Sequence, residues 1–209
     1  MLIRKLTRKL TVLLAAAAAL LALTGCGSND TDPQTTTQTA ANGDEFNDAD
    51  VDFATNMIPH HAQALQMVDL TMGRSLDPLV AALTEDIRDA QGPEIETMTD
   101  WLTAWGEPIP ETPRDHTNAG HDGTSGMDMS GDEMPGMMSS DELAELEAAS
   151  DAHFQDMWLT MMIAHHQGAI EMARTEQTKG TYTPATDIAK SIETSQQQEI
   201  SQMEELLDS

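Results

Sequence analysis

The sequence predicts an all-α protein, a four-helix bundle built from two repeated helical hairpins. Three observations support this prediction. A motif in residues 53–69 returns in residues 158–174, apolar residues in both segments recur every three or four positions, and no segment of useful length alternates as a strand would. A duplicated two-helix unit of this kind buries its apolar face by stacking on its twin.

The repeat keeps a constant offset of 105 residues between the two halves. In the first segment the shared residues are Thr55, Met57, Ile58, His60, His61, Ala64 and Met67, which recur as Thr160, Met162, Ile163, His165, His166, Ala169 and Met172. In the second segment they are Ile87, Gln91, Glu94, Ile95, Met98 and Leu102, which recur as Ile192, Gln196, Glu199, Ile200, Met203 and Leu207. One offset held over roughly fifty residues indicates an internal duplication.

The chain begins with a segment typical of a bacterial lipoprotein. Residues 1–9 are basic, and residues 10–23 form an uncharged apolar run, shorter than the roughly 20 residues that a membrane-spanning helix needs. The run ends in Leu23-Thr24-Gly25-Cys26, which resembles a lipobox. We therefore expect a signal peptide in residues 1–25 and lipidation of Cys26, although an ordinary secretory signal with an incidental cysteine is the alternative. Because Cys26 is the single cysteine, an intramolecular disulfide and a cysteine-based zinc site are excluded.

The rest of the chain divides by composition. Residues 26–45 are polar, which predicts a disordered tether between the membrane surface and a four-helix domain in residues 46–209. Within that domain, repeat one covers residues 47–105, a connecting loop covers residues 106–138, and repeat two covers residues 139–208.

Start signals place the two helices of repeat one. Asn47 is the expected N-cap of a first helix that runs to about Met72, where a glycine stops it. Asp77 and Pro78 supply the N-cap and first residue of a second helix, which ends near Trp105 before another glycine.

Repeat two carries similar signals. Ser139 and Glu142 form a capping box for a third helix, which is expected to end near Lys179. A fourth helix begins at Thr183-Pro184 and ends near Leu207.

Composition and charge narrow the function. The chain carries 36 acidic against 10 basic residues, a net charge of −26, so its surface repels phosphate backbones and attracts cations, which excludes nucleic acid binding. Its 15 methionines outnumber its aromatic residues, which is unusual for an apolar core. Neither a nucleophile–base constellation nor a glycine-rich phosphate loop is visible, so we do not expect an enzyme.

The connecting loop is rich in metal-ligand side chains. Its candidates are His116, His121, Met127, Met129, Met134, Met137 and Met138. Five methionines in a short, acidic loop without periodicity favour an accessory metal site over core packing, and a random acidic linker is the alternative.

A Met-x-x-His-His motif recurs in both halves and supplies the main ligand candidates. They are Met57, His60, His61, Met162, His165 and His166. Thioether sulfur selects Cu(I), and imidazole accepts Cu(I), Cu(II) or Zn(II). Adjacent histidines diverge by about 100° around a helix, so one should face the bundle axis and the other a neighbouring helix or the surface. The alternative is that these histidines are structural, with their nitrogens bonded to carboxylates.

Other helices would complete such sites. The candidates are Glu94, Met98, Glu199, Met203 and the opposite histidine pair. Glutamates on helices more often support a site than bind its metal, and methionines at helical spacing more often belong to the core. A row at four-residue steps, formed by His153, Met157, Met161 and His165, is either an extra metal track or one edge of the packed face.

Protonation should separate the two kinds of ligand. Thioethers need no deprotonation, so Cu(I) binding by the loop methionines is expected to persist at pH ~5. An unperturbed histidine titrates near ~6.5, so the share bound by the histidines is expected to weaken on acidification.

The segments MIPHHAQALQM, MMIAHHQGAIEMA and MPGMMSSDELAEL, with a repeated Q-x-x-E-I-x-x-M pattern, resemble the bacterial family of domain of unknown function 305 over residues 46–209. The resemblance implies a ferritin-like bundle made of a duplicated hairpin, in many members secreted or lipidated. Its CopM-like members bind copper through Met and His, which favours the six motif residues as ligands and the loop methionines as accessory ligands. The chain lacks the Glu-x-x-His pairs of ferritin-like di-iron sites, which argues against iron oxidation.

These observations predict an extracytoplasmic lipoprotein, held on a bacterial membrane through its lipid anchor only. Its expected ligand is copper, as Cu(I) and also as Cu(II), with other soft or borderline metals as further candidates, bound for sequestration, homeostasis or resistance. A copper-handling protein is a candidate partner, and the oligomeric state is left open. The alternatives are a metal oxidase, and an interaction module in which the His and Met side chains are core.

Overall fold

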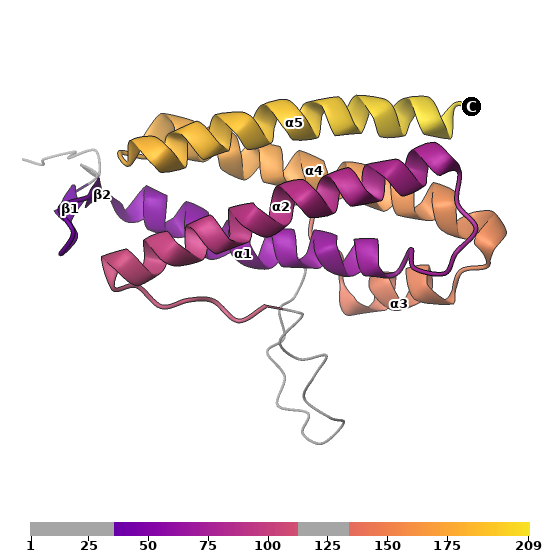
Figure 1. The fold of residues 1–209 in the computed structure, drawn as a ribbon, viewed down its shortest axis with the longest axis horizontal. Coiled ribbons are helices and arrows are strands. Elements are labelled where there is room, and N and C mark those ends of the chain that lie inside the picture. The colour runs from indigo at the N-terminus through magenta and orange to yellow at the C-terminus, as the bar shows by residue number, and fades with distance from the viewer. Residues whose placement is uncertain (1–35, 113–133) are drawn as a thin grey trace, which may run out of the picture. The chain divides into compact units, whose positions relative to one another are not determined.

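The computed structural model describes residues 36–112 and 134–209 (Figure 1). The signal peptide, Cys26 and four of the loop candidates (His116, His121, Met127 and Met129) lie outside the described residues.

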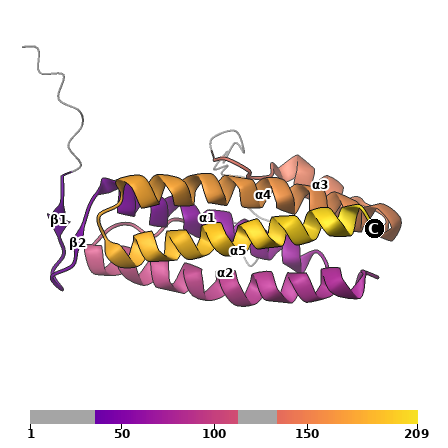
Figure 2. The same ribbon diagram turned by 90° about the horizontal axis from the view of Figure 1, so that it is seen from above.

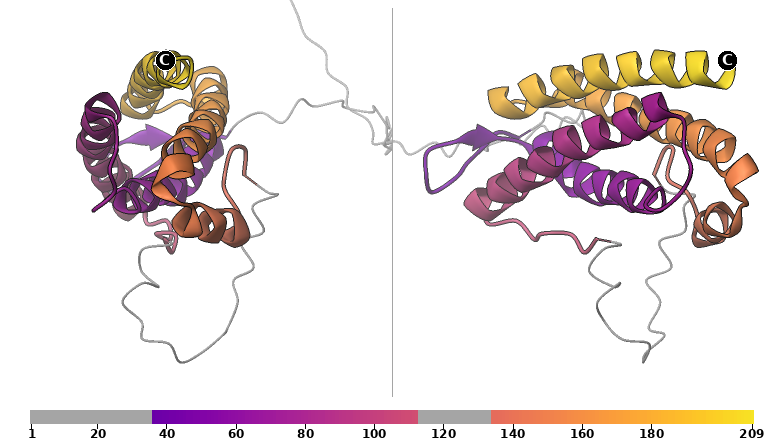
Figure 3. Two further views of the ribbon diagram at one scale, coloured as in Figure 1. Left: turned by 90° about the vertical axis from the view of Figure 1, so that its right-hand side faces the viewer. Right: turned by 45° about the vertical axis from the view of Figure 1, so that its right-hand side comes forward.

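Four long helices form the body of the described chain. They are α1 (Asp48–Asp69), α2 (Pro78–Trp105), α4 (Asp151–Lys179) and α5 (Thr183–Leu207). Helix α1 packs against α2 and α4, and α4 packs against α5, so the two hairpins meet along α1 and α4 (Figure 2). Seen end-on, the long helices surround a common interior (Figure 3). The predicted fold class, a helical bundle with two repeated hairpins, is confirmed.

The predicted caps define most helix boundaries. The side chain of Asn47 accepts hydrogen bonds from the backbone at the start of α1, and Asp77 does the same for α2. Gly106 ends α2 in the left-handed conformation, with φ 79°. The first helix ends at Asp69 rather than near Met72, because the chain enters successive turns there before Gly73 adopts φ 80°.

The third predicted helix is in fact two helices. The capping box of Ser139 starts a short helix, α3 (Ser140–Ala148), which packs on α4. Ala149 is extended, with ψ 141°, and α4 begins two residues later. Arg74, from the turn after α1, donates to the carbonyls of Glu147 and Ala149 and so binds backbone oxygens exposed by the break.

A small β-ribbon lies within the segment that the sequence assigns to the tether. Strands β1 (Gln38–Thr39) and β2 (Glu45–Phe46) pair in antiparallel fashion, and Phe46 stacks on Trp105 with ring centroids 4.6 Å apart. Residues 36–45 are therefore part of the folded unit, and the tether boundary at residue 45 is too late.

The core is divided into two apolar clusters. Cluster one is formed by buried side chains from all four long helices and from β2. They are Phe53, Ala54, Met57, Ile58, Met98, Trp101, Leu102, Trp105, Ala169, Ala173, Ala185, Ala189 and Ile192, together with Phe46. Cluster two likewise contains Ala64, Met67, Val68, Val80, Leu83, Ile87, Phe154, Trp158, Leu159, Met162, Ile170, Ile200 and Met203, together with Leu146 of α3.

A polar layer lies between the two clusters on α1, α2 and α5, while on α4 Ile170 of cluster two lies beyond it. Its residues are His60 and His61 on α1, Gln91 and Glu94 on α2, His165 and His166 on α4, and Gln196 and Glu199 on α5.

In the described part of the chain, no helix is long and apolar enough to cross a membrane.

Candidate metal centre

The two histidine pairs meet inside the bundle. All four imidazole side chains are fully buried. His60 and His165 lie against each other across the contact between α1 and α4, with ring centroids 3.8 Å apart and planes tilted by 39°. The expected divergence within each pair is therefore seen, and the first histidine of each pair lies at the bundle axis.

The second histidine of each pair faces a glutamate on the other helix of its own hairpin. His61 Nε2 lies 2.8 Å from Glu94 Oε2, and His166 Nε2 lies 2.5 Å from Glu199 Oε2. Both contacts join residues 33 positions apart, so the duplication has preserved them as equivalent pairs. A carboxylate that accepts from an imidazole fixes the tautomer and orientation of the ring.

The last part of the connecting loop, residues 134–138 (the strap), packs beside His60 and against the backbone of α4. The carbonyl of Pro135 lies 3.1 Å from His60 Nε2. Gln63 fixes the end of the strap, donating to the carbonyl of Met138 and accepting from its backbone N–H. Gly168 allows this close approach, because a Cβ atom there would collide with the Pro135 carbonyl.

Five imidazole nitrogens in this centre have no hydrogen-bond partner within the described residues. They are His60 Nδ1, His61 Nδ1, His165 Nδ1, His165 Nε2 and His166 Nδ1, all buried. A buried polar atom without a partner costs about 1–3 kcal/mol, so such groups usually indicate an absent ion or water. The donors are imidazole nitrogens, and a methionine precedes each histidine pair by one helical turn, a combination that fits a soft or borderline metal.

Burial also controls the protonation of the central pair. It lowers the pKa of His60 to about 3, with a further contribution from neighbouring His61 and an opposing one from the Pro135 hydrogen bond. Burial, followed by the proximity of His60, also lowers the pKa of His165 well below its ordinary value. The two central rings therefore resist protonation on acidification more than an unperturbed histidine does.

The motif methionines flank the polar layer on opposite sides. Met57 is fully buried in cluster one, and Met162 is fully buried in cluster two. Each precedes its histidines by one helical turn, and the opposite directions of α1 and α4 place the two side chains on either side of the layer. The described residues contain no group of three or more His, Cys, Asp or Glu side chains that could hold a metal ion.

The remaining candidates lie further out. Met98 and Met203 are fully buried in clusters one and two, as expected for core residues. Three strap methionines, Met134, Met137 and Met138, are half-buried. In the row along α4, His153 is exposed, whereas Met157 and Met161 are half-buried against cluster two.

Sequence reasoning missed two glutamines of the polar layer. Gln91 and Gln196 are almost fully buried, and Gln91 Nε2 and Oε1 and Gln196 Oε1 lack partners within the described chain. Their recurrence at the repeat offset was the available signal, because a polar residue kept at an inward position in both halves indicates a polar interior.

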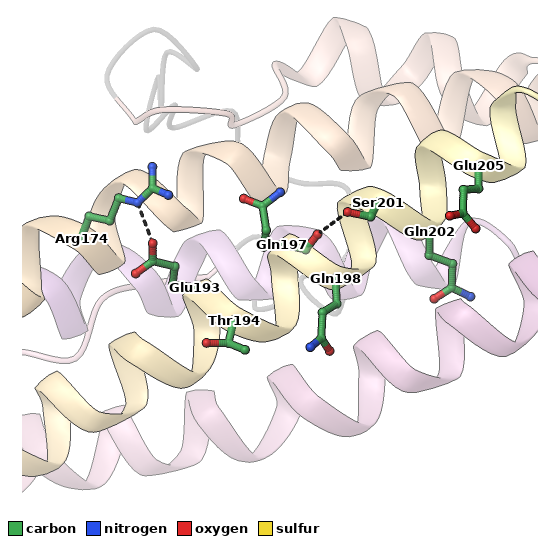
Figure 4. Close-up of a pocket in the computed structure, with 8 residues that line it drawn as sticks. All are labelled: Arg174, Glu193, Thr194, Gln197, Gln198, Ser201, Gln202 and Glu205. Carbon is green, nitrogen blue, oxygen red and sulfur yellow. Dashed lines mark hydrogen bonds and ion pairs between the residues drawn. The ribbon is translucent and has the colours of Figure 1, made fainter.

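A shallow groove on the outer face of α4 and α5 lies apart from this centre. The eight side chains that line it are drawn in Figure 4, and none of them is His or Met. The groove therefore offers none of the ligand types that the repeated motif brings to the polar layer.

Comparison with known proteins identifies one family. The family model described as domain of unknown function (DUF305) matches residues 50–207. A crystal structure of a DUF305 fragment from Deinococcus radiodurans is 28% identical, with a TM-score of 0.63, and covers 82% of this chain and 99% of its own. A candidate secreted DUF305 protein from Streptomyces coelicolor is 29% identical, with a TM-score of 0.64, and covers 77% of this chain and 92% of its own.

CopM in its Cu(II)-bound form is also similar. It is 27% identical, with a TM-score of 0.60, and covers 76% of this chain and 95% of its own. Structures of CopM with Cu(I) and with silver are 25% identical to this chain. No curated protein sequence matches the chain.

Proposed function

The chain belongs to the DUF305 family, and from that premise we propose that it binds copper through the Met and His side chains of its polar layer, as cargo rather than for catalysis. The observation that carries the proposal is the set of five buried, unpartnered imidazole nitrogens among the described residues. The metal-bound forms of CopM support copper as the ion, and its silver-bound form supports a preference for soft ions.

The residues would divide the work as follows. His60 and His165 supply neutral nitrogens at the bundle axis, and Met57 and Met162 supply thioethers one turn away. His61 and His166 add a second nitrogen on each side, with their rings held by Glu94 and Glu199. The strap methionines are half-buried and would act as accessory ligands during entry or release. Sequestration at the cell envelope is the role that this ligand set suits, since its soft donors need no thiolate in an oxidising compartment.

Metal analysis after dialysis tests the proposal. The purified protein, loaded with Cu(I), Cu(II) or Zn(II), should retain copper, and a His60→Ala/His165→Ala variant should lose most of it while remaining helical. The matched control is His153→Ala, because His153 is exposed on α4 and away from the axis. Equal copper retention by all three proteins would refute the assignment, and oxygen uptake during copper cycling would indicate a metal oxidase instead.

We also propose that Cys26 anchors the protein to a membrane on the extracytoplasmic side. The basic start, the short apolar run and the lipobox-like ending support this assignment, as does the secreted class to which the Streptomyces coelicolor relative is assigned. Cys26→Ser should move the protein from the membrane fraction to the soluble fraction. Unchanged membrane fractionation would contradict the anchor.

A further inference from the structure

We propose that His60, His61 and His166 offer the metal their Nδ1 atoms, and that Glu94, Glu199 and the Pro135 carbonyl are positioning groups that fix this choice. The inference rests on the proposed function and adds to it the identity of the ligand atom.

Each Nε2 atom of these three rings faces an oxygen that can only accept a hydrogen bond. The acceptors are the Pro135 carbonyl at 3.1 Å from His60, the Glu94 carboxylate at 2.8 Å from His61, and the Glu199 carboxylate at 2.5 Å from His166. A carbonyl oxygen and an ionised carboxylate donate nothing, so Nε2 must carry the proton. In a neutral imidazole, the other nitrogen is then a bare lone pair.

The surroundings of Nδ1 agree with a proton on Nε2 and none on Nδ1. A proton on Nδ1 would need an acceptor, but the Nδ1 atoms of His60, His61 and His166 are buried and have none among the described residues. An unpaired buried donor is strongly unfavourable, whereas an unpaired lone pair is the state that a metal ion requires. Nδ1 is thus available to a metal ion on all three rings, although their Nε2 partners come from three different segments, the strap, α2 and α5.

His165 is the exception, and it breaks the two-fold symmetry of the centre. Both of its ring nitrogens lack partners within the described chain, although it occupies the position equivalent to His60. The reason is that the connecting loop occurs once, so its strap supplies a carbonyl to one of the two central rings only. His165 can therefore present either nitrogen to a metal.

Nitrogen NMR of the full chain, labelled with ¹⁵N at histidine, tests the assignment directly. Silver(I) is the probe, because it is soft, diamagnetic and does not change oxidation state during the measurement. Before metal is added, His60, His61 and His166 should each show a protonated Nε2 and an unprotonated Nδ1. After silver is added, the Nδ1 resonances should shift and acquire coupling to silver, while the Nε2 protons remain.

Substitution of the positioning groups gives a second readout. Glu94→Gln and Glu199→Gln keep the side-chain shape, but the new amide can turn its NH₂ group toward Nε2 and so favour the opposite tautomer. Each should lower silver affinity about 10-fold and reduce the Nε2–H signal of its own histidine. Glu96→Gln on α2 and Glu204→Gln on α5 are the matched controls, since both residues are exposed on the same helices.

The outcomes separate this inference from the proposed function. Silver bound through Nε2, with loss of the Nε2 protons, would overturn the inference and leave metal binding intact. Unchanged tautomers in Glu94→Gln and Glu199→Gln would remove the positioning role. A chain that retains no silver at all would overturn the proposed function, and the inference with it.

Discussion

At the scale of single residues, burial sets the chemistry of the central imidazoles before any metal is bound. His60 and His165 have lowered pKa values, so they should remain neutral at pH 5, whereas the same residues in the urea-unfolded chain should titrate near ~6.5. Histidine NMR between pH 7 and pH 5 measures this for both states. Titration of His60 near pH 6.5 in the folded chain would show that the ring is hydrated.

Lowered histidine pKa values also affect stability. Between pH ~6.5 and about 3, the unfolded chain binds protons that the folded chain rejects, so the free energy of unfolding contributed by His60 falls as pH falls. The contribution is fully present above ~6.5 and is lost on acidification. His165 acts in the same direction because its pKa is also lowered.

A second buried residue, Glu176 on α4, has the opposite dependence. Burial first, and then Asp50, raise the pKa of Glu176 to about 8. Asp50 is itself buried and accepts backbone hydrogen bonds from Thr181 and Tyr182. The unfolded glutamate ionises near 4.5, so the free energy of unfolding falls as pH rises from 4.5 to 8.

Glu176→Gln removes that ionisation while keeping the side-chain shape. We expect the variant to gain about 3–5 kcal/mol of stability relative to the parent between pH 4.5 and pH 8. Urea denaturation at the two pH values measures the difference, in which the contributions of His60 and His165 cancel. A difference independent of pH would show that Glu176 is ionised in the folded chain.

Residue-level prediction from the sequence was good for the histidines and poor for their surroundings. The Met-x-x-His-His repeat predicted that one histidine of each pair faces the bundle axis, because adjacent residues on a helix must diverge, but it did not show which one. The sequence contains no comparable signal for the Pro135 carbonyl, because a backbone atom of a loop is placed by tertiary packing. Burial lowers the pKa values of His60 and His165, which the sequence did not indicate, since local sequence does not report the solvation of a side chain.

At the scale of elements, the strap and α4 fit together through glycine. Gly168→Ala would place a Cβ atom against the Pro135 carbonyl, so the strap must move and its hydrogen bond to His60 should be lost. We expect the free energy of unfolding to fall by about 1–3 kcal/mol, with weaker silver binding. Urea denaturation and silver titration measure the two effects.

The matched control for this substitution is Gly92→Ala. Gly92 lies inside α2, and a Cβ atom there would meet nothing within 4 Å. Because alanine favours a helix interior over glycine, this variant should be more stable by about 0.5–1 kcal/mol. Equal effects of both substitutions would mean that the strap does not depend on close packing at Gly168.

Element boundaries show where sequence reasoning succeeds and where it stops. The caps at Asn47, Asp77, Ser139 and Gly106 are local signals, and each defines the boundary expected of it. The break between α3 and α4 has its stabilising partner, Arg74, in the other repeat. The local sequence of residues 139–179 therefore could not predict the break, because the residue that stabilises it lies outside that segment.

At the scale of the whole molecule, the two apolar clusters should hold the bundle together without metal. Each cluster draws buried side chains from α1, α2, α4 and α5. Far-UV circular dichroism of the chelator-treated protein should therefore show a mainly helical chain, and metal at 100 times its dissociation constant should add about 2.7 kcal/mol of stability. A chain that stays unfolded until copper is added would make the metal structural.

The polar layer has a consequence for cooperativity. Trp158 lies in cluster two, whereas Trp101 and Trp105 lie in cluster one, so each end of the bundle carries its own fluorescent reporter. The two ends share the four long helices but meet at the polar layer, where several polar atoms lack partners among the described residues. The core is therefore held together least strongly at this layer. An ion that satisfies those atoms would join the two ends into one cooperative unit, and its release would let them loosen separately. Metal binding should then convert two separate unfolding transitions, followed by the fluorescence of the tryptophans at each end, into one.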